Sequence, residues 1–124
     1  MLRARGIDHI VMNVSDARRS VAWWRDLLGA EPVRFDEWEA GDVPFASVRL
    51  NDDTIIDLFE VSRTGVNVDH VCVVVEGADL DAVATGGSFE VTGPPMQLFG
   101  ARGTGTGLYV KDPDGNTVEL RTYP

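Results

Sequence analysis

The two histidines of this 124-residue chain occupy positions that repeat one another. His9 lies in residues 7–14 and His70 in residues 68–75, and in both segments an Asp-His pair precedes an apolar run. The two side chains are 61 residues apart in sequence. Such self-similarity indicates a structure built from two related halves.

Carboxylates repeat together with the histidines. Residues 54–59 align with residues 116–121, and the spacing from histidine to carboxylate is 48 residues in the first half and 49 in the second. Two imidazoles and two carboxylates form a mixed nitrogen and oxygen ligand set that suits Zn, Ni, Mn, Co or Fe. The alternative is two ordinary strand histidines with solvated acids, which is the usual interpretation of an isolated histidine. The repeat favours one divalent metal ion held by His9, Asp57, His70 and Glu119.

Strand parity supports a shared face for these residues. Side chains alternate between the two faces of a strand, so His9 points away from the face that carries Ile10 and Met12. The apolar face is expected to lie under a helix, and the histidine then faces the inner surface of a sheet. Glu60 has the opposite parity from Asp57 and is excluded as a ligand.

The elements that must position these residues follow a βαβββ order in each half. In the first half, Ser15 or Asp16 caps a helix that Gly29 ends, and Trp23 and Trp24 are expected to be mostly core. Residues 93–107 are rich in glycine and proline, and we expect a mobile loop there. Residues 112–116 predict a hairpin turn. The predicted helices are 17–28 and 78–84, and the predicted strands after each are 32–39, 45–50 and 54–61, then 88–92, 105–111 and 116–123.

Composition limits the class of protein. The length fits a single domain, and 44% hydrophobic with 25% charged residues is typical of a soluble globular chain. A formal charge of −9 opposes binding to nucleic acid. The sequence contains neither a signal-peptide pattern nor an apolar run long enough for a membrane span, so we expect a cytoplasmic protein. The single Cys72 is interpreted as a small core residue.

Four segments resemble the vicinal oxygen chelate superfamily, which includes glyoxalase I, extradiol dioxygenases, methylmalonyl-CoA epimerase, fosfomycin-resistance enzymes and bleomycin-binding proteins. They read DHIVMNVSDARRSVAWWRDLLG, TIIDLFE, DHVCVVVE and LYVKDPDGNTVEL. The chain is also similar to the virulence-associated, glyoxalase-like group. The resemblance implies an α+β fold of two βαβββ modules, about residues 5–62 and 66–124, whose curved mixed sheet surrounds a metal in one domain spanning residues 1–124. It also implies a homodimer, because paired modules cover open sheet edges.

The ligand positions of that superfamily carry over to His9, Asp57, His70 and Glu119, with one departure. Asp57 stands where a longer Glu is usual, so it binds the metal directly, binds through water, or leaves a three-ligand site with open positions. An obvious glutathione-binding set is not found. Candidate substrate-binding residues, each with an alternative structural role, are Phe45, Ser47, Arg49, Arg102, Tyr109 and Arg121.

Three functions fit these observations. The first is a metal-dependent lyase or isomerase of the glyoxalase type, in which Asp57 or Glu119 removes a proton from a small oxygenated substrate and the cation stabilises the enolate. The second is an extradiol-type dioxygenase, which normally uses further histidines that this chain lacks. The third is a non-catalytic small-molecule binding protein of the bleomycin-resistance kind, whose members generally lack the ligands kept here.

Overall fold

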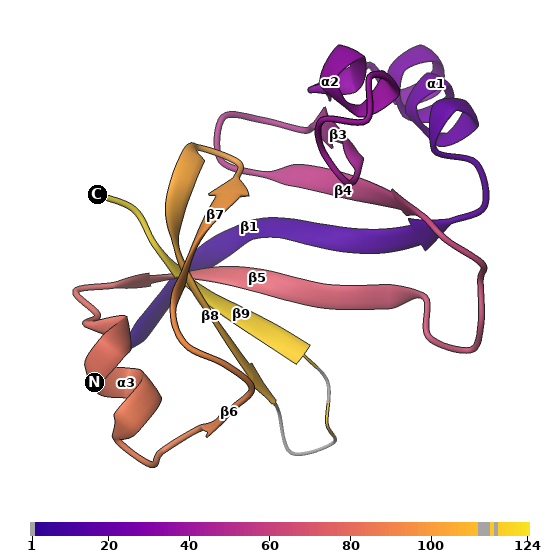
Figure 1. Ribbon diagram of the computed structural model, residues 1–124. Helices are drawn as coiled ribbons and strands as arrows, with labels where there is room; N and C mark the ends of the chain where they lie inside the picture. Colours follow the sequence, from indigo (N-terminus) through magenta and orange to yellow (C-terminus); the bar gives the residue numbers. More distant parts are fainter. Residues whose placement is uncertain (1, 112–114, 116) are drawn as a thin grey trace. The chain divides into compact units, whose positions relative to one another are not determined.

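The computed structural model describes residues 2–111, 115 and 117–124 (Figure 1). Its elements alternate in the predicted order, with one helix added to the first module and one strand to the second. The first module contains β1 (Arg3–Val14), α1 (Ala17–Leu28), β2 (Glu31–Val33), α2 (Phe35–Glu39), β3 (Ala46–Arg49) and β4 (Ile55–Glu60). The second contains β5 (Val68–Glu76), α3 (Leu80–Thr85), β6 (Glu90–Val91), β7 (Met96–Gly100), β8 (Gly103–Lys111) and β9 (Thr117–Thr122). This α+β arrangement is the predicted fold class.

The chain divides into two compact units that do not coincide with the modules. The central unit is Ile10–Asp69, and the terminal unit combines Met1–His9 with His70–Pro124. The first part of β1, which carries His9, therefore belongs to the same unit as the second module. Each unit is described by itself below.

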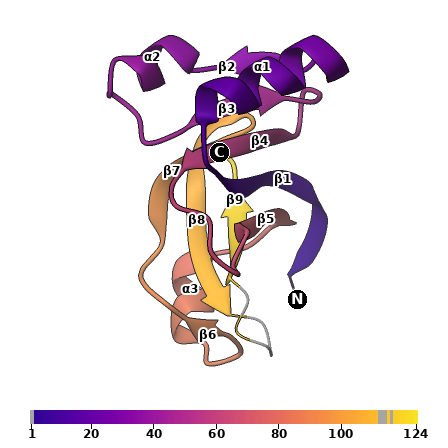
Figure 2. The ribbon, with the colours of Figure 1, turned by 90° about the vertical axis from the view of Figure 1, so that its right-hand side faces the viewer.

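In the central unit, α1 packs on one face of the antiparallel strands β2, β3 and β4 (Figure 2). Asp16 caps α1 by accepting a hydrogen bond from the Arg19 amide, and Gly29 ends it in the left-handed conformation at φ 68°. Glu60, which parity excludes as a ligand, accepts from the Ala17 amide at the start of this helix. The core beneath the helix is made of Val21, Ala30, Ala46, Val48, Ile56 and Leu58.

Two expectations for the central unit were wrong. Residues 32–39 do not form one strand, because Arg34 adopts a left-handed conformation (φ 58°) between β2 and the short helix α2. Trp24 packs against the core as expected, whereas Trp23 is 50% exposed.

In the terminal unit, the strand order is β5, β9, β8, β6, with β7 also paired to β8. The β5–β9 pair is parallel and the others are antiparallel, so the pairing is mixed. Asp79 caps α3, which covers a core that contains Val75, Leu108 and Leu120. This sheet carries Glu119 on β9 beside β5 and β8, and both neighbours contribute to the site described below.

The predicted mobile loop at 93–107 was also wrong. Met96–Gly100 forms β7, which pairs residue by residue with the first half of β8. The predicted turn at 112–116 falls mainly on residues 112–114 and 116, which lie outside the described residues, although β8 and β9 pair on either side of it. Among the described residues, no helix is long and apolar enough to cross a membrane.

Candidate metal centre

Three of the four predicted ligands come together in the terminal unit. His9 is supplied by β1, His70 by the start of β5 and Glu119 by the middle of β9. Glu119 Oε2 lies 3.2 Å from His9 Nε2 and 3.3 Å from His70 Nε2, and the two nitrogens are 3.4 Å apart. Donor atoms of all three residues thus fall within one small, nearly equilateral triangle.

These spacings suit a shared cation. Ligand atoms about 2.1 Å from one metal lie about 3.0 Å apart at right angles and about 3.4 Å apart at tetrahedral angles. Within the described residues, Glu119 Oε2 is buried and has no hydrogen-bond partner beyond its close contacts with the two imidazoles. A buried carboxylate oxygen without a hydrogen bond is costly. The residues present therefore fit a divalent ion, which would supply the missing interaction.

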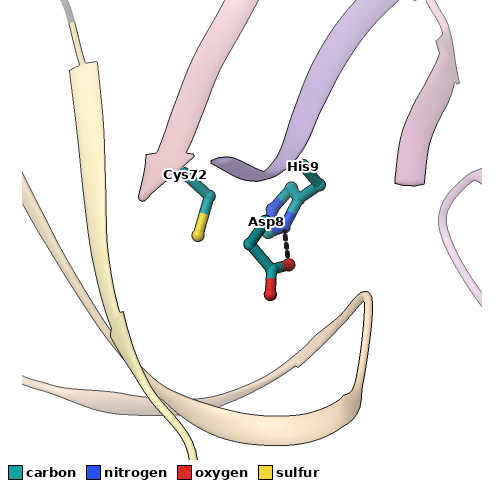
Figure 3. A group of neighbouring side chains, drawn as sticks. All are labelled: Asp8, His9 and Cys72. Carbon is teal, nitrogen blue, oxygen red and sulfur yellow. Dashed lines mark hydrogen bonds and ion pairs between the residues drawn. The ribbon is translucent and has the colours of Figure 1, made fainter. Parts of the chain in front are cut away.

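Asp8 fixes which nitrogen of His9 is available. Its Oδ1 lies 2.6 Å from His9 Nδ1 (Figure 3). The same oxygen accepts a hydrogen bond from the Ala101 amide at 2.9 Å. Its Oδ2 accepts from the Tyr123 hydroxyl. Burial raises the pKa of Asp8, but these three hydrogen bonds outweigh it and lower the pKa below its usual value. An ionised carboxylate only accepts, so His9 donates from Nδ1 and its Nε2 is left to face Glu119.

Arg121 engages the other oxygen of Glu119. Its Nε and Nη2 donate to Glu119 Oε1 at 3.0 and 2.8 Å, while Nη1 and Nη2 donate to the carbonyls of Leu98 and Phe99. Burial raises the pKa of Glu119, but the neighbouring imidazoles of His70 and His9 and the Arg121 guanidinium lower it well below its usual range. Glu119 is therefore held as a carboxylate with Oε2 toward the imidazoles.

A second donor group lies beside the first. Asp8, His9 and Cys72 bring oxygen, nitrogen and sulfur donor atoms within 4.8 Å of one another, and Figure 3 shows the three side chains together. The Asp8 carboxylate already accepts three hydrogen bonds. Burial raises the pKa of the Cys72 thiol, which disfavours the thiolate that binds metals. The triangle of His9, His70 and Glu119 is thus the better cation site.

The remaining site residues of the terminal unit have different surroundings. Tyr109 is the cross-strand partner of Glu119. Its ring lies edge-on to the His70 ring, with 5.2 Å between the ring centroids. Arg121 is completely buried. Arg102 is exposed, with its guanidinium 4.3 Å above the Tyr123 ring.

The other predicted site residues lie in the central unit. Asp57 and Ser47 are fully buried cross-strand partners, and the Ser47 hydroxyl donates to Asp57 Oδ1 at 2.5 Å. Arg49 donates to the carbonyls of Asn51 and Asp52. Phe45 contacts Phe59 at 6.0 Å between ring centroids.

Sequence reasoning missed Asp8 and Tyr123 as members of the site. The repeat carried a partial signal, because an aspartate precedes the histidine in both halves. Asp8 is fully buried, however, whereas its counterpart Asp69 is exposed. Only the folded chain distinguishes the two, since the partners of Asp8 come from Ala101 and Tyr123.

The family follows from comparison with known proteins. Residues 6–120 match the model of the Glyoxalase/Bleomycin resistance protein/Dioxygenase superfamily. The chain belongs to this superfamily. It is 26% identical to the Virulence protein STM3117 of Salmonella typhimurium, over 94% of this chain and 83% of that protein. It is 27% identical to the glyoxalase domain-containing protein RDO1 of Mycosarcoma maydis, over 98% of this chain and 70% of that protein.

Solved structures of other proteins share the fold of this chain. A Mn(II)-bound glyoxalase from Novosphingobium aromaticivorans superposes with a TM-score of 0.71 at 23% identity, over 98% of this chain. The chain spans only 40% of that protein. Methylmalonyl-CoA epimerase from Streptomyces coelicolor superposes with a TM-score of 0.69 at 23% identity, over 98% of this chain and 96% of the epimerase.

Proposed function

We propose that this protein is a divalent-metal-dependent, glyoxalase-like lyase or isomerase that acts on a small oxygenated substrate. The observation that carries the proposal is the triangle of His9 Nε2, His70 Nε2 and Glu119 Oε2 with sides of 3.2 to 3.4 Å. Superfamily membership gives independent support, as does the likeness in fold to a Mn(II)-bound glyoxalase and to methylmalonyl-CoA epimerase. The ion when bound would polarise a substrate oxygen and stabilise an enolate.

The residues of the site have two further roles in the proposal, which are metal binding and proton removal. His9, His70 and Glu119 hold the ion, and Glu119 is a weak base because its pKa is lowered and Arg121 occupies its Oε1. In the proposal, Asp57, the other carboxylate of the repeat, therefore accepts the proton of the substrate. The alternative role of Asp57 is that of a fourth ligand of the ion. The sequence repeat supports this role for Asp57.

The proposal also covers the residues that contact the substrate, the oligomeric state and the cellular location of the protein. Tyr109 lies against His70, and we propose that it contacts the substrate beside the ligands. Phe45, Ser47, Arg49 and Arg102 remain proposed substrate contacts. We expect a cytoplasmic homodimer, and light scattering of the metal-loaded protein at micromolar concentration should give twice the 13.5 kDa chain mass. A fully loaded monomer would refute the dimer.

The test begins with metal stoichiometry. The purified protein, stripped and then reloaded with Mn²⁺, should bind one ion per site, and His70→Ala should bind none. Loaded protein is then assayed against α-ketoaldehyde adducts, epimerisable acyl thioesters and catechols while dissolved oxygen is monitored. Turnover without oxygen consumption supports the proposal. Catechol cleavage with stoichiometric oxygen uptake by the Fe²⁺ form would replace it with the dioxygenase, and metal binding without turnover of any substrate would favour a binding protein.

A further inference from the structure

We propose that Asp8 and Arg121 are positioning residues that orient His9 and Glu119 toward the metal, and that the β7–β8 hairpin holds both of them in place. Neither residue would be a ligand of the ion. Asp8 acts through His9 Nδ1 and Arg121 acts through Glu119 Oε1. The inference rests on the proposed metal site and adds the residues that determine its geometry.

The Asp8 contact selects one nitrogen of His9. A histidine ligand binds a metal through one ring nitrogen while the other donates a hydrogen bond, and that bond sets both the tautomer and the orientation of the ring. Here the 2.6 Å contact between Nδ1 and Asp8 leaves Nε2 pointing to Glu119. Asp8 is itself immobilised by the Ala101 amide and the Tyr123 hydroxyl.

The Arg121 contact selects one oxygen of Glu119. With Oε1 bound by two guanidinium nitrogens, only Oε2 is turned toward the imidazoles, so the carboxylate offers the metal a single oxygen. The guanidinium cannot swing away easily, because two of its nitrogens also donate to the Leu98 and Phe99 carbonyls on β7.

Glycines of the β7–β8 hairpin provide the space that the side chains of Arg121 and Glu119 occupy. A Cβ on Gly107 would lie 2.5 Å from Glu119 Oε1, and a Cβ on Gly100 would lie 2.5 Å from Arg121 Nη1. A Cβ on Gly105 would meet the Thr122 carbonyl at 2.6 Å. Each distance is too short for a real Cβ atom. Close packing on Arg121 and Glu119 therefore explains the glycines at 100 and 107.

The β7–β8 hairpin contacts both positioning residues, Asp8 and Arg121. Its β7 strand supplies two carbonyls to Arg121, and its tip supplies the Ala101 amide to Asp8 and the Arg102 amide to Tyr123. A local change in the hairpin is therefore transmitted to His9 and to Glu119, although none of its residues is a metal ligand.

Asp8 is tested with Asp8→Ala and the conservative Asp8→Asn. Mn²⁺ affinity, measured by calorimetry on folded protein, should fall about 10- to 100-fold in Asp8→Ala. It should stay close to wild type in Asp8→Asn, whose amide oxygen still accepts from Nδ1. In Zn²⁺-loaded protein, nitrogen NMR should show His9 bound through Nε2, with a slowly exchanging Nδ1–H that is lost only in Asp8→Ala.

Two results would overturn the role of Asp8. One is wild-type affinity in a folded Asp8→Ala protein. The other is a wild-type spectrum in which His9 binds zinc through Nδ1, and this measurement decides the matter even if Asp8→Ala does not fold.

The contact between Arg121 and Glu119 Oε1 is tested through the space that this oxygen needs. Gly107→Ala keeps every charge but displaces Glu119 Oε1, whereas a Cβ on Gly93 meets nothing within 4 Å, which makes Gly93→Ala the matched control. Gly107→Ala should weaken Mn²⁺ binding about 10-fold or more. It should also change the Co²⁺ absorption spectrum, because a displaced carboxylate alters the coordination geometry, and Gly93→Ala should change neither. A folded Gly107→Ala protein with unchanged affinity and spectrum would refute the proposal.

These outcomes separate the two proposals. If the wild-type protein binds no divalent ion, the metal-dependent function itself fails. If the wild type binds one ion per site and Asp8→Ala and Gly107→Ala bind it equally well, the function stands and the positioning roles are wrong.

Discussion

Glu119 supplies the only carboxylate oxygen of the proposed metal triangle of His9, His70 and Glu119, so its charge should dominate affinity for the ion. Glu119→Gln keeps the size and shape of the side chain but removes that charge, and with its amide oxygen on Arg121 it turns an NH2 group instead of Oε2 toward the imidazoles. We expect Mn²⁺ affinity to fall by more than the roughly 100-fold that loss of an indirect partner can cause. Calorimetric titration measures this. Glu90→Gln, the same change at an exposed site on β6, is the control and should have no effect.

Proton competition gives a second prediction at the residue scale. Burial lowers the pKa of His9, but its contacts with Asp8, Cys72 and Glu119 outweigh burial and raise the pKa to about 12. Below that pKa, His9 carries a proton that the ion must displace from Nε2. Mn²⁺ affinity should therefore rise with pH, by about tenfold per pH unit for one released proton. Titrations at pH 7, 8 and 9 test this, and a flat profile would contradict it.

At the scale of elements, helix α1 was predicted with its observed limits because both of its ends carry local signals. Asp16 accepts from the Arg19 amide at the start, and Gly29 provides the left-handed end. Asp16→Ala should lower the free energy of unfolding by about 1 kcal/mol. Urea denaturation measures the loss. Asp26→Ala, at an exposed position in the last turn, is the control, and equal losses in the two variants would refute the capping role.

Elements without local signals were not predictable from sequence. The segment 32–39 is broken at Arg34 by a left-handed conformation that arginine rarely adopts. The 93–107 segment has the composition of a loop, yet it forms β7 because pairing with β8 and close packing on Arg121 stabilise it.

The residues of the site also separate into those with a local sequence signal and those without one. His9, His70 and Glu119 were identified because each sits at a repeated position with the right strand parity. Asp8 was missed because the Ala101 amide that donates to its carboxylate is 93 residues away in the chain. Local pattern therefore indicates which residues gather in the triangle, whereas their hydrogen-bond partners depend on contacts distant in the sequence.

At the scale of the whole molecule, a bound ion should stabilise the folded chain. An ion that binds only the folded state at 100 times its dissociation constant adds about 2.7 kcal/mol. The melting temperature should then rise by roughly 10 °C. Calorimetric scans with and without Mn²⁺ test this, with His9→Ala as the control. An equal rise in that variant would show that the ion binds elsewhere.

The location of the ion tests the central claim most directly. Crystals of the Mn²⁺-loaded protein, measured at a wavelength where manganese scatters anomalously, reveal the position of the ion independently of the protein atoms. The account predicts one strong peak about 2.0 to 2.2 Å from His9 Nε2, His70 Nε2 and Glu119 Oε2. A peak bonded to other residues, or no peak in crystals that contain stoichiometric manganese, would contradict it.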